Sequence, residues 1–575
     1  MRYLGKYVKK YYKLALLSIF FLSIEVFCDL LQPTIMSRMV DHGIANRDLR
    51  YVLVAGSIML IMTGIGAVGA VIRNNLSSIV SQRFGTELRL DLFRKIQSLS
   101  YEKAGIFDTA SLVTRLTNDV TQTQNFVNGL MRIFAKTPLI CIGSIVMAVS
   151  LDAKLSLIIA LIVPLVIAII YLNTRVGYPL FQKVQKALDH INGVMREYLS
   201  GIRVVKAFNR FDYEENRFSD SNERLMNTQV LTMRVMAVFS PIIMLIINLG
   251  IICVLWFGGI AVNDGSLEVG KTIAFINYMT QLSSSLMMLS MVFTAFVRAR
   301  ASAERIGEVM NVEEPVRPEQ LDMHEHEHIT NIEFKNVNFS YTGQENDAIL
   351  KQISFSCRTG MTLGIIGSTG SGKSTLVNLI PRFYEATTGG VYVSGHNVCE
   401  LDEQALRCRI SMVPQQNTLF TGTIIDNIRW GNEHATDAEV EQAAQIAQAH
   451  DFIMSFPDGY HTVLGQGGVN LSGGQKQRIS IARALVRPSD VLILDDCTSA
   501  VDVMTESKIL TGLRSRSKEL ICMIIAQRIT SVMGTDLIVV LDNGEIAGQG
   551  THEELLQSCS IYRDIYVSQF GEVAV

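Results

Sequence analysis

Six long apolar stretches constrain this chain more than any other feature of its sequence. They lie at roughly 14–38, 51–75, 133–151, 155–175, 236–262 and 273–297, and each is near the ~20 residues that a helix needs to cross a hydrocarbon core. The rest of the 575 residues holds no comparable stretch. The sequence therefore predicts a membrane α-helical bundle of six transmembrane helices, followed by a water-soluble region.

Charge in the connecting segments predicts the orientation of this bundle. The long segments 76–132 and 176–235 are rich in Arg and Lys, whereas the loop 263–270 is short and acidic. By the positive-inside rule, the long segments, the soluble region and both termini face the cytoplasm. Apolar and charged residues alternate at helical spacing in the long segments, so we expect cytoplasmic helical extensions with turns near 101–108 and 209–216. The chain is predicted to be a multi-pass protein of the cell membrane, in contact with the lipid bilayer.

Composition argues against several other classes. The net charge of −3 gives no reason to expect a nucleic-acid partner. Nine cysteines are scattered without a CxxC pair, which favours a reducing cytosol over a disulfide framework. The basic and aromatic start, MRYLGKYVKKYYK, lacks a small-residue cleavage site. We therefore expect an amphipathic helix on the inner membrane surface there, and no signal peptide.

A glycine-rich motif identifies the chemistry of the soluble region. A membrane domain at 1–311 and a polar linker at 312–330 precede a soluble domain at 331–575. Within it, GIIGSTGSGKST matches G-x-x-x-x-G-K-[ST] between an apolar strand and a helix. Such a loop surrounds phosphates with main-chain N–H groups; Lys373 is expected to reach the β- and γ-phosphates, and the Ser374 hydroxyl to bind Mg²⁺. The predicted nucleotide-binding residues here are Gly367, Ser368, Thr369, Gly370, Ser371, Gly372, Lys373, Ser374 and Thr375.

A second motif, LSGGQKQR at 471–478, precedes the acidic strand VLILDD at 491–496. With these motifs the chain resembles the ATP-binding cassette (ABC) family over essentially its whole length, as an exporter-type half-transporter with an α/β P-loop ATPase domain. The resemblance implies ATP and Mg²⁺ as ligands. It also implies transport by alternating access, driven by the closing of two cassettes on two nucleotides. The resemblance implies that Tyr341 stacks on adenine and that magnesium is bound by Ser374, Gln415 and Asp495. It implies that Asp502 contacts the region between the two sites. The residues that would contact the nucleotide of an opposing cassette are Leu471, Ser472, Gly473, Gly474 and Gln475.

Two residues expected at the P-loop site depart from the family pattern. Asp496 stands where the catalytic base is usually Glu, and Gln527 stands where a His is usual. The shorter acid places its carboxylate roughly 1.5 Å back, and a misplacement near 1 Å can cost on the order of 100-fold in rate. A glutamine can donate a hydrogen bond but cannot carry a charge. The two changes together predict a P-loop site that binds ATP and hydrolyses it slowly.

The LSGGQ signature, in contrast, is intact, so the chain combines a weak P-loop site with a complete signature. The chain would complete the competent site of a partner, and in this it resembles the degenerate-site subunit of bacterial heterodimeric multidrug exporters. That resemblance implies a second ABC half-transporter as partner, a bacterial plasma membrane, and amphipathic small molecules or drugs as substrates. An importer, an ATP-gated sensor or channel, and a homodimeric exporter remain open. Gln466 replaces a usual Glu before the signature, which puts the strength of coupling to the membrane domain in question.

Three further features have more than one interpretation. HEHEH at 324–328 alternates imidazoles with carboxylates and is either a metal site or a solvated linker. Asp29, in the first span, either stabilises a helix interface or contacts substrate. The last span carries four methionines that suit either ordinary packing or an adaptable cavity, with polar residues beside them. These residues are Met279, Met287, Met288 and Met291, with Asn277, Tyr278 and Gln281.

Overall fold

The computed structural model describes residues 4–312, 328–344, 347–516 and 519–571. The chain forms two compact units. Unit 1 comprises Met1–Leu99 and Ile106–Glu313, and unit 2 comprises Ser100–Gly105 and Glu314–Val575. Most of the predicted linker, including His324 to Glu327 of the HEHEH segment, lies outside the described residues.

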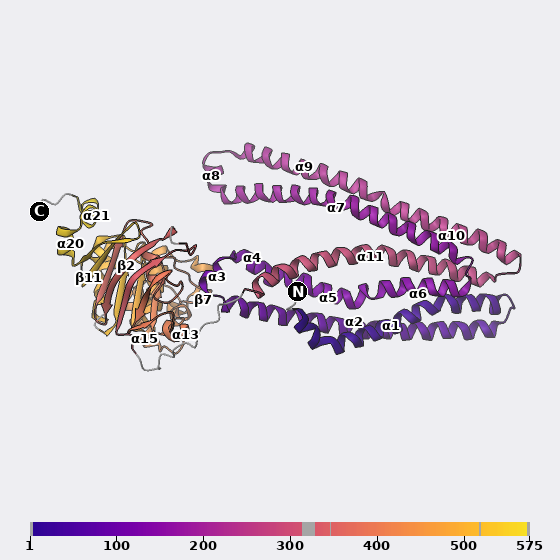
Figure 1. Cartoon of the computed structure of the whole chain (residues 1–575), viewed down its shortest axis with the longest axis horizontal. Coiled ribbons are helices and arrows are strands. Elements are labelled where there is room, and N and C mark those ends of the chain that lie inside the picture. The colour runs from indigo at the N-terminus through magenta and orange to yellow at the C-terminus, as the bar shows by residue number, and fades with distance from the viewer. Residues whose placement is uncertain (1–3, 313–327, 345–346, 517–518, 572–575) are drawn as a thin grey trace. The chain divides into compact units, whose positions relative to one another are not determined.

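Unit 1 is entirely helical in its described part (Figure 1). All six predicted spans fall on its helices to within a residue. The elements are α1 (Leu4–Arg38), η1 (Met39–Ile44), α2 (Leu49–Ser98), α4 (Thr109–Thr114), η2 (Arg115–Asp119), α5 (Val120–Gly129), η3 (Leu130–Phe134), α6 (Lys136–Leu151), α7 (Ser156–Ser200), α8 (Ile202–Ala207), α9 (Phe211–Ala237), α10 (Phe239–Asn263) and α11 (Val269–Met310).

Five helical stretches of the described chain are long and apolar enough to cross a membrane. They are Lys9–Ile44, Leu49–Ser98, Thr109–Leu151, Ser156–Ser200 and Phe211–Asn263. The sixth predicted span lies within α11, a helix of 42 residues that is long enough to cross but is not among those five. Helices this long extend well past a ~30 Å hydrocarbon core, in agreement with the predicted cytoplasmic extensions.

The expected surface helix at the start of the chain is wrong. Described residues from Leu4 onward form the first turns of α1, which continues without interruption into the first span. Lys6 forms an ion pair with Asp91 at 3.0 Å, and the Tyr7 hydroxyl donates to the same carboxylate at 2.7 Å. The Tyr11 hydroxyl donates to Glu87 at 2.7 Å. These acids of α2 therefore hold the basic segment against a neighbouring helix.

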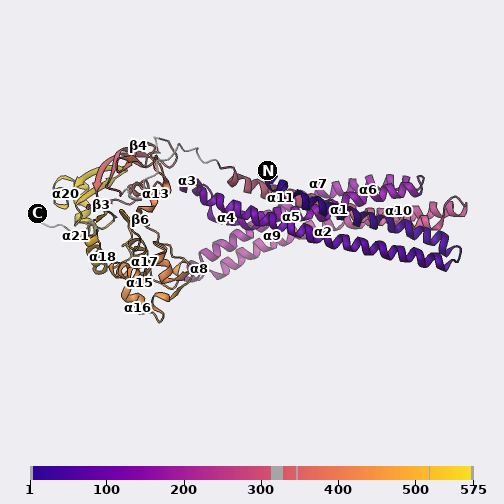
Figure 2. The same cartoon turned by 90° about the horizontal axis from the view of Figure 1, so that it is seen from below.

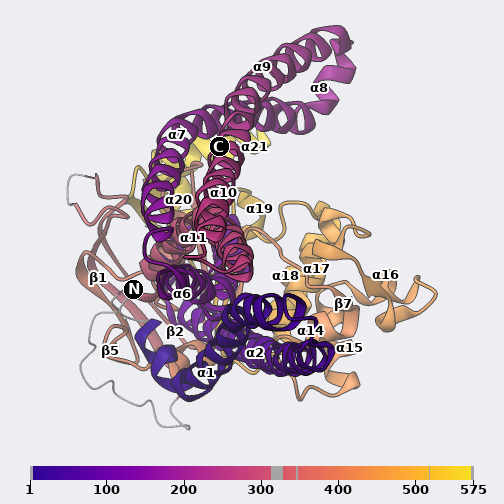
Figure 3. The same ribbon diagram turned by 90° about the vertical axis from the view of Figure 1, so that its right-hand side faces the viewer.

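The helices α7 and α9 pack along each other and diverge from α1, α2 and α5 toward α8 (Figures 1 and 3). The turn between them lies at α8 and the three residues after it, slightly before the predicted 209–216. Large apolar side chains are exposed along this hairpin beyond the predicted spans, and water-exposed clusters of this kind mark interaction surfaces. They are Leu188, Met195, Leu199, Phe211, Phe218 and Met226.

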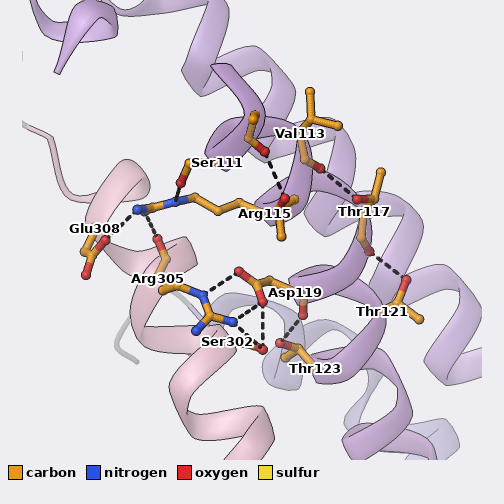
Figure 4. Close-up of polar contacts among 12 residues, drawn as sticks. Ser111, Val113, Arg115, Thr117, Asp119, Thr121, Thr123, Ser302, Arg305 and Glu308 are labelled. Carbon is orange, nitrogen blue, oxygen red and sulfur yellow. Dashed lines mark hydrogen bonds and ion pairs between the residues drawn. The ribbon is translucent and has the colours of Figure 1, made fainter. Parts of the chain in front are cut away.

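A buried carboxylate ties the end of α11 to η2 (Figure 4). The side chain of Asp119 is fully buried, and Arg305 donates two hydrogen bonds to it, one of them from Nε to Oδ2 at 2.8 Å. Ser302 donates to Oδ1 of the same group at 2.9 Å. One turn away, Arg115 pairs with Glu308 at 2.8 Å. The polar side chains of α11 thus lock its last turns to the segment that precedes α5.

Unit 2 contains a six-stranded sheet of order β12-β11-β3-β10-β9-β6, a four-stranded antiparallel sheet of order β2-β1-β4-β5, and the pair β7-β8. The strands are β1 (Asn331–Phe339), β2 (Leu350–Arg358), β3 (Thr362–Gly367), β4 (Thr388–Val393), β5 (His396–Asn397), β6 (Ile410–Val413), β7 (Gly422–Thr423), β8 (Val463–Leu464), β9 (Val491–Asp495), β10 (Ile521–Ile525), β11 (Leu537–Asp542) and β12 (Glu545–Gly550).

The helices of unit 2 are short. In Figures 2 and 3, α15, α16 and α17 are grouped on one side of the unit, away from β1 and β4. The bounds are α3 (Tyr101–Gly105), α12 (Lys373–Asn378), α13 (Glu403–Cys408), α14 (Ile424–Arg429), α15 (Asp437–Ile446), α16 (His450–Met454), η5 (Gly459–His461), η6 (Gln466–Gly468), α17 (Gly473–Leu485), α18 (Val503–Arg516), α19 (Ile529–Val532), α20 (His552–Ser558) and α21 (Ser560–Phe570).

The large sheet is parallel at its centre and buried on both faces. Strands β3, β9 and β10 are buried at every position, which explains their continuous apolar sequences. Alternate residues of β9 enter two different cores, with Leu492 and Leu494 on one face and Val491 and Ile493 on the other. A sheet of this kind presents the carboxyl ends of neighbouring strands at one edge, where ligands bind in open α/β folds.

Candidate functional site

Four neighbouring parallel strands bring the predicted site residues to one edge of the large sheet. The order is β3, β10, β9 and β6. Gly367 ends β3, Asp495 ends β9, and Gln527 and Gln415 each follow two residues after the ends of β10 and β6. Residues separated by more than 150 positions in sequence are thereby collected in one place, as the motif analysis requires.

The glycine-rich loop connects β3 to α12 as predicted. Gly370 and Gly372 have φ of +86° and +95°, in the left-handed region where side chains are strained. At Gly367 a Cβ would come within 2.0 Å of the Leu541 carbonyl oxygen. The loop therefore needs glycine at all three positions to follow this close path.

Lys373 lies inside the loop. Its Nζ donates to the carbonyl oxygens of Gly367 and Ser368, at 2.9 and 2.7 Å. Burial lowers the pKa of this ammonium, and the nearby carboxylates of Asp496 and Asp495 oppose that shift. The hydroxyl oxygen of Ser371 is buried in the same loop and has no hydrogen-bond partner in the described chain, so a donor-rich cradle with an unsatisfied polar atom is in place for a phosphate.

The oxygen ligands expected for magnesium lie beside this loop. Ser374 donates from Oγ to Oδ1 of Asp495 at 3.0 Å. Burial raises the pKa of Asp495, and the negative charge of Asp496 raises it further. A hydroxyl and a carboxylate are the hard oxygen donors that Mg²⁺ prefers, and the neighbouring residue Gln415 offers a third oxygen. The donor set therefore fits the ion.

Asp496 is held in a strained and enclosed position. Its φ is +46°, and its main-chain N–H donates to the carbonyl of Ile525 at 2.9 Å. Gln527 donates from Nε2 to Oδ2 of Asp496 at 2.9 Å, and Gln415 donates a further hydrogen bond to the carboxylate. Burial raises the pKa of Asp496, while Lys373 and these two amides oppose the shift. The two residues of this site that depart from the family pattern, Asp496 and Gln527, therefore contact each other directly.

Tyr341 lies in a cluster of aromatic rings. Its ring is 47% exposed and meets Phe339 and Tyr384 edge-on, at centroid distances of 4.9 and 5.1 Å. Its hydroxyl is 3.0 Å from the Thr375 hydroxyl, next to the glycine-rich loop. A ring with its edges fixed and its surface half exposed can stack on a planar base.

The helix α3 contributes to the same cluster. Tyr101 stacks on Phe383 with the ring centroids 5.5 Å apart, and it meets Tyr384 edge-on at 5.5 Å. Tyr384 thus touches both Tyr101 and Tyr341. Although α3 lies between α2 and α4 in sequence, it belongs to unit 2.

The signature LSGGQ forms the start of α17. Ser472 and Gln475 make a reciprocal capping box: the Ser472 hydroxyl accepts from the Gln475 N–H at 3.3 Å, and the Gln475 side chain accepts from the Ser472 N–H at 2.9 Å. Leu471 is buried, and a Cβ at Gly474 would lie 2.9 Å from the Ala500 carbonyl. The structure does not join the signature to the glycine-rich loop by any hydrogen bond between described residues.

Asp502, expected between the two sites, directly precedes α18. Its carboxylate accepts from the Thr505 N–H at 2.9 Å, and hydrogen bonds from the side chain and the main chain of Thr505 hold the pKa of Asp502 below its usual range. Gln466 lies exposed in η6, and the described His328 contacts Asp490 at 2.8 Å. No group of three or more His, Cys, Asp or Glu side chains that could hold a metal ion occurs among the described residues.

Three positioning residues carried no signal in the sequence. Gln477 connects α17 to the segment after β9, with its Oε1 accepting from the Ala500 N–H at 3.0 Å. Glu506 is buried and accepts from Thr498 at 2.7 Å. Gln569 of α21 donates to the Gln527 carbonyl at 2.8 Å and accepts from the Ile529 N–H at 2.9 Å. Gln477 lies 23 positions from Ala500 and Gln569 lies 42 positions from Gln527, so a local motif cannot reveal these two contacts. Glu506 lies only eight positions from Thr498, but no motif marks that pair.

Comparison with known proteins agrees with this geometry. A family model described as "ABC transporter transmembrane region" matches residues 15–286, and one described as "ABC transporter" matches residues 350–499. The chain is 41% identical over 566 residues to the ABC transporter ATP-binding protein YfiB of Bacillus subtilis, covering 98% of each. This chain belongs to the ABC transporter family.

The half-transporter also resembles exporters over most of its length. It is 32% identical over 501 residues to an ATP-dependent lipid A-core flippase of Syntrophus aciditrophicus, covering 86% of this chain and 82% of the flippase. It is 25% identical to a bacterial Atm1-family ABC exporter solved with ATP bound, with a TM-score of 0.79 and 99% of both chains covered. The predicted fold, a helical membrane domain joined to an ABC ATPase domain, is confirmed, and the ABC exporter couples ATP hydrolysis to transport.

Proposed function

We propose that this exporter is one subunit of a heterodimer that moves amphipathic small molecules or drugs out of a bacterial cell. Its own P-loop site binds ATP through residues 367–375, with adenine on Tyr341, and hydrolyses it slowly. Mg²⁺ is bound at Ser374, Gln415 and Asp495. Residues 471–475 and Asp502 complete the competent site of a second half-transporter. The domain bounds proposed for this arrangement are 1–311, 312–330 and 331–575, with the ATPase domain and both termini in the cytoplasm.

The contact between Gln527 and Asp496 carries the proposal of a slow site. The shortened acid is turned toward the neutral amide at 2.9 Å. A general base works best when it reaches the attacking water and is free to take its proton. Asp496 is short, and part of its acceptor capacity is used by two glutamine amides. A neutral amide cannot share a charge that a His at position 527 could carry.

Two further observations support assembly with a second subunit. The capping box of the signature leaves the first turn of α17 formed without a contribution from the chain's own glycine-rich loop. The hairpin of α7 and α9 exposes the apolar side chains given above. A second half-transporter would cover them.

The test is the ATPase activity of the purified full chain, alone and co-expressed with candidate half-transporters from the same genome. Two matched substitutions identify the working site: Asp496→Asn in this chain, and Glu→Gln at the corresponding acid of the partner. We expect turnover that requires both chains, collapses with the partner's substitution, and largely survives Asp496→Asn.

Brisk hydrolysis by this chain alone, abolished by Asp496→Asn, would overturn the proposal. It would make Asp496 a working base and the exporter a homodimer. The control is Asp564→Asn, which removes one charge from an exposed acid of α21 and leaves the contact between Asp496 and Gln527 untouched.

A further inference from the structure

Unit 1 contains a cavity of about 400 Å³ whose wall is rich in cations. Arg73 of α2, Arg132 of η3 and Lys136 of α6 all line it. This volume lies within the range of small-molecule sites, ~300–1,000 Å³. Three basic side chains from three helices line this one cavity, and charged side chains in or beside membrane spans are rare and commonly functional.

Two acids balance part of this charge from outside the cavity wall. Glu25 is buried and pairs with Arg73 at 2.8 Å and with Lys136 at 2.6 Å. Asp29 pairs with Lys136 at 3.1 Å. Neither carboxylate is among the residues that line the cavity. The acids therefore neutralise Arg73 and Lys136 without placing negative charge on the cavity surface.

Arg132 is the third cation of the cavity wall, and neither Glu25 nor Asp29 pairs with it. Its side chain is exposed, and no carboxylate of the described chain lies within ion-pair distance of it. Its carbonyl accepts from Arg73 Nη1 at 3.2 Å, which fixes the backbone beside the cavity. Three cations against two carboxylates leave a single positive charge. The cavity thus has the electrostatic complement of a monoanion.

One face of α11 supplies a polar part of the wall. Asn277, Thr280, Gln281 and Ser284 recur at helical spacing and offer amides and hydroxyls. Met288 continues this face, and Ile140 of α6 adds an aliphatic surface. A polar, cationic region next to an apolar one suits a molecule with a charged head and an apolar body.

We propose that this cavity binds an amphipathic anion through Arg132, with one carboxylate, sulfonate or phosphate group at the cation and an apolar body toward Ile140 and Met288. The inference rests on the proposed transport function in one respect, because it makes this anion the substrate class. It assigns Arg73 and Lys136 to positioning, since their charges are already paired. It also resolves Asp29 as part of the ion-pair network of the helix interface.

The test is a fluorescence titration of the full chain in nanodiscs of phosphatidylcholine, without nucleotide. The probes are 11-(dansylamino)undecanoic acid and its methyl ester, which differ only in the negative charge. We expect the acid to bind about tenfold more tightly than the ester, as for a charge-assisted hydrogen bond. Arg132→Gln should remove that preference and leave binding of the ester unchanged.

Arg175→Gln is the matched control. Arg132 and Arg175 each lie about 19 residues from the tight turn between α6 and α7, so their depths along the two helices are similar. Arg175 is exposed and does not line the cavity. We expect Arg175→Gln to bind both probes as the wild type does. Because Arg132 has no carboxylate partner, its replacement leaves no buried acid unpaired, and thermal unfolding of each variant verifies that it is folded.

Equal binding of acid and ester by the wild type would overturn the inference, as would an equal loss of acid binding in both variants. A further arm adds phosphatidylglycerol to the discs. Displacement of the acid that depends on Arg132 identifies a lipid head group as a source of the anion, and its absence identifies a free amphiphile. Binding here needs neither hydrolysis nor a partner, so it can fail while the proposed heterodimer stands, and the reverse also holds.

Discussion

Gln527 donates a hydrogen bond from Nε2 to Oδ2 of Asp496 across 2.9 Å. This contact joins the two residues at which the P-loop site departs from the family pattern, and it connects the ends of the adjacent parallel strands β9 and β10. An amide that donates to a carboxylate stabilises the ionised acid and also restricts the direction in which that acid can accept another proton. The two substitutions therefore act as one unit, and their effects on rate should not be additive.

Restoring both residues tests this coupling. Asp496→Glu combined with Gln527→His is expected to raise ATP hydrolysis at this P-loop by on the order of 100-fold, because the acid regains about one methylene of reach. Either change alone should give much less. Phosphate release is measured with the partner's own acid changed to Gln, so that only this site contributes. Equal gains from the single and double variants would contradict the coupling.

The ionised carboxylates of Asp495 and Asp496 should lower the stability of the folded state at neutral pH. Burial raises the pKa of Asp495 and of Asp496 above 3.8, and the negative charge of Asp496 raises that of Asp495 further. A folded pKa above the unfolded one means that stability falls as pH rises through this interval. Asp496→Asn should therefore raise the unfolding temperature of nucleotide-free protein at pH 7 by about 2 °C, with a smaller gain near pH 4.

Asp502 is the control for this pH series, because its pKa is shifted in the opposite direction on folding. Its pKa is held low by hydrogen bonds from Thr505, so its contribution is present at neutral pH and is lost as pH falls through the folded pKa. Asp502→Ala is expected to lower the unfolding temperature at pH 7. Shifts of the same sign for the two variants would show that the loss of charge alone, rather than its surroundings, sets the effect.

Gln569 should determine how often the segment around Gln527 opens. It forms hydrogen bonds with the main chain on both sides of Arg528, through the Gln527 carbonyl and the Ile529 N–H. A hydrogen bond of this kind contributes about 0.5–1.5 kcal/mol, so Gln569→Ala should speed amide exchange at Ile529 by roughly tenfold. Ser568→Ala, at the exposed neighbouring position of α21, is the control. Unchanged protection would assign the order of this segment to other contacts.

The ion pair between Arg305 and Asp119, shown in Figure 4, should contribute more stability than a surface ion pair on the same helix. Arg305→Ala leaves the buried carboxylate of Asp119 unpaired, at a cost of about 3 kcal/mol. Arg300→Ala removes an exposed pair with Glu304 on the same helix and should cost less than ~0.5 kcal/mol. Unfolding by SDS, followed by far-UV circular dichroism, compares the two. Equal losses would show that burial of Asp119 does not set the energy.

The sequence was sufficient where a local pattern determines local geometry. Runs of apolar residues specify membrane spans because the bilayer imposes a length, and GSTGSGKS specifies a loop because its glycines permit backbone angles that other residues resist. The order of the carboxyl ends of β3, β10, β9 and β6 then brings Asp495, Gln415 and Gln527 together. Parallel α/β topology supplies that step without further information.

Contacts between segments that are distant in sequence could not be predicted from the sequence. The basic start of the chain has the composition of a surface helix, but Glu87 and Asp91 of α2 hold it within a longer helix. Gln569 lies 42 positions from Gln527, and Glu25 lies 48 from Arg73. A single sequence gives each of these residues a chemistry but does not give it a partner.

The assignment of α3 to unit 2 limits how this protein can be divided. Six residues encoded inside the membrane region, Ser100–Gly105, belong to unit 2. Tyr101 among them completes the aromatic surface of Phe383 and Tyr384, and Tyr384 in turn fixes the edge of Tyr341. An ATPase unit excised at its apparent boundary would lose Tyr101 and expose those rings. Chimaeras that exchange ATPase units between half-transporters therefore need to carry residues 100–105 as well, and recombination at a single breakpoint separates parts that fold together.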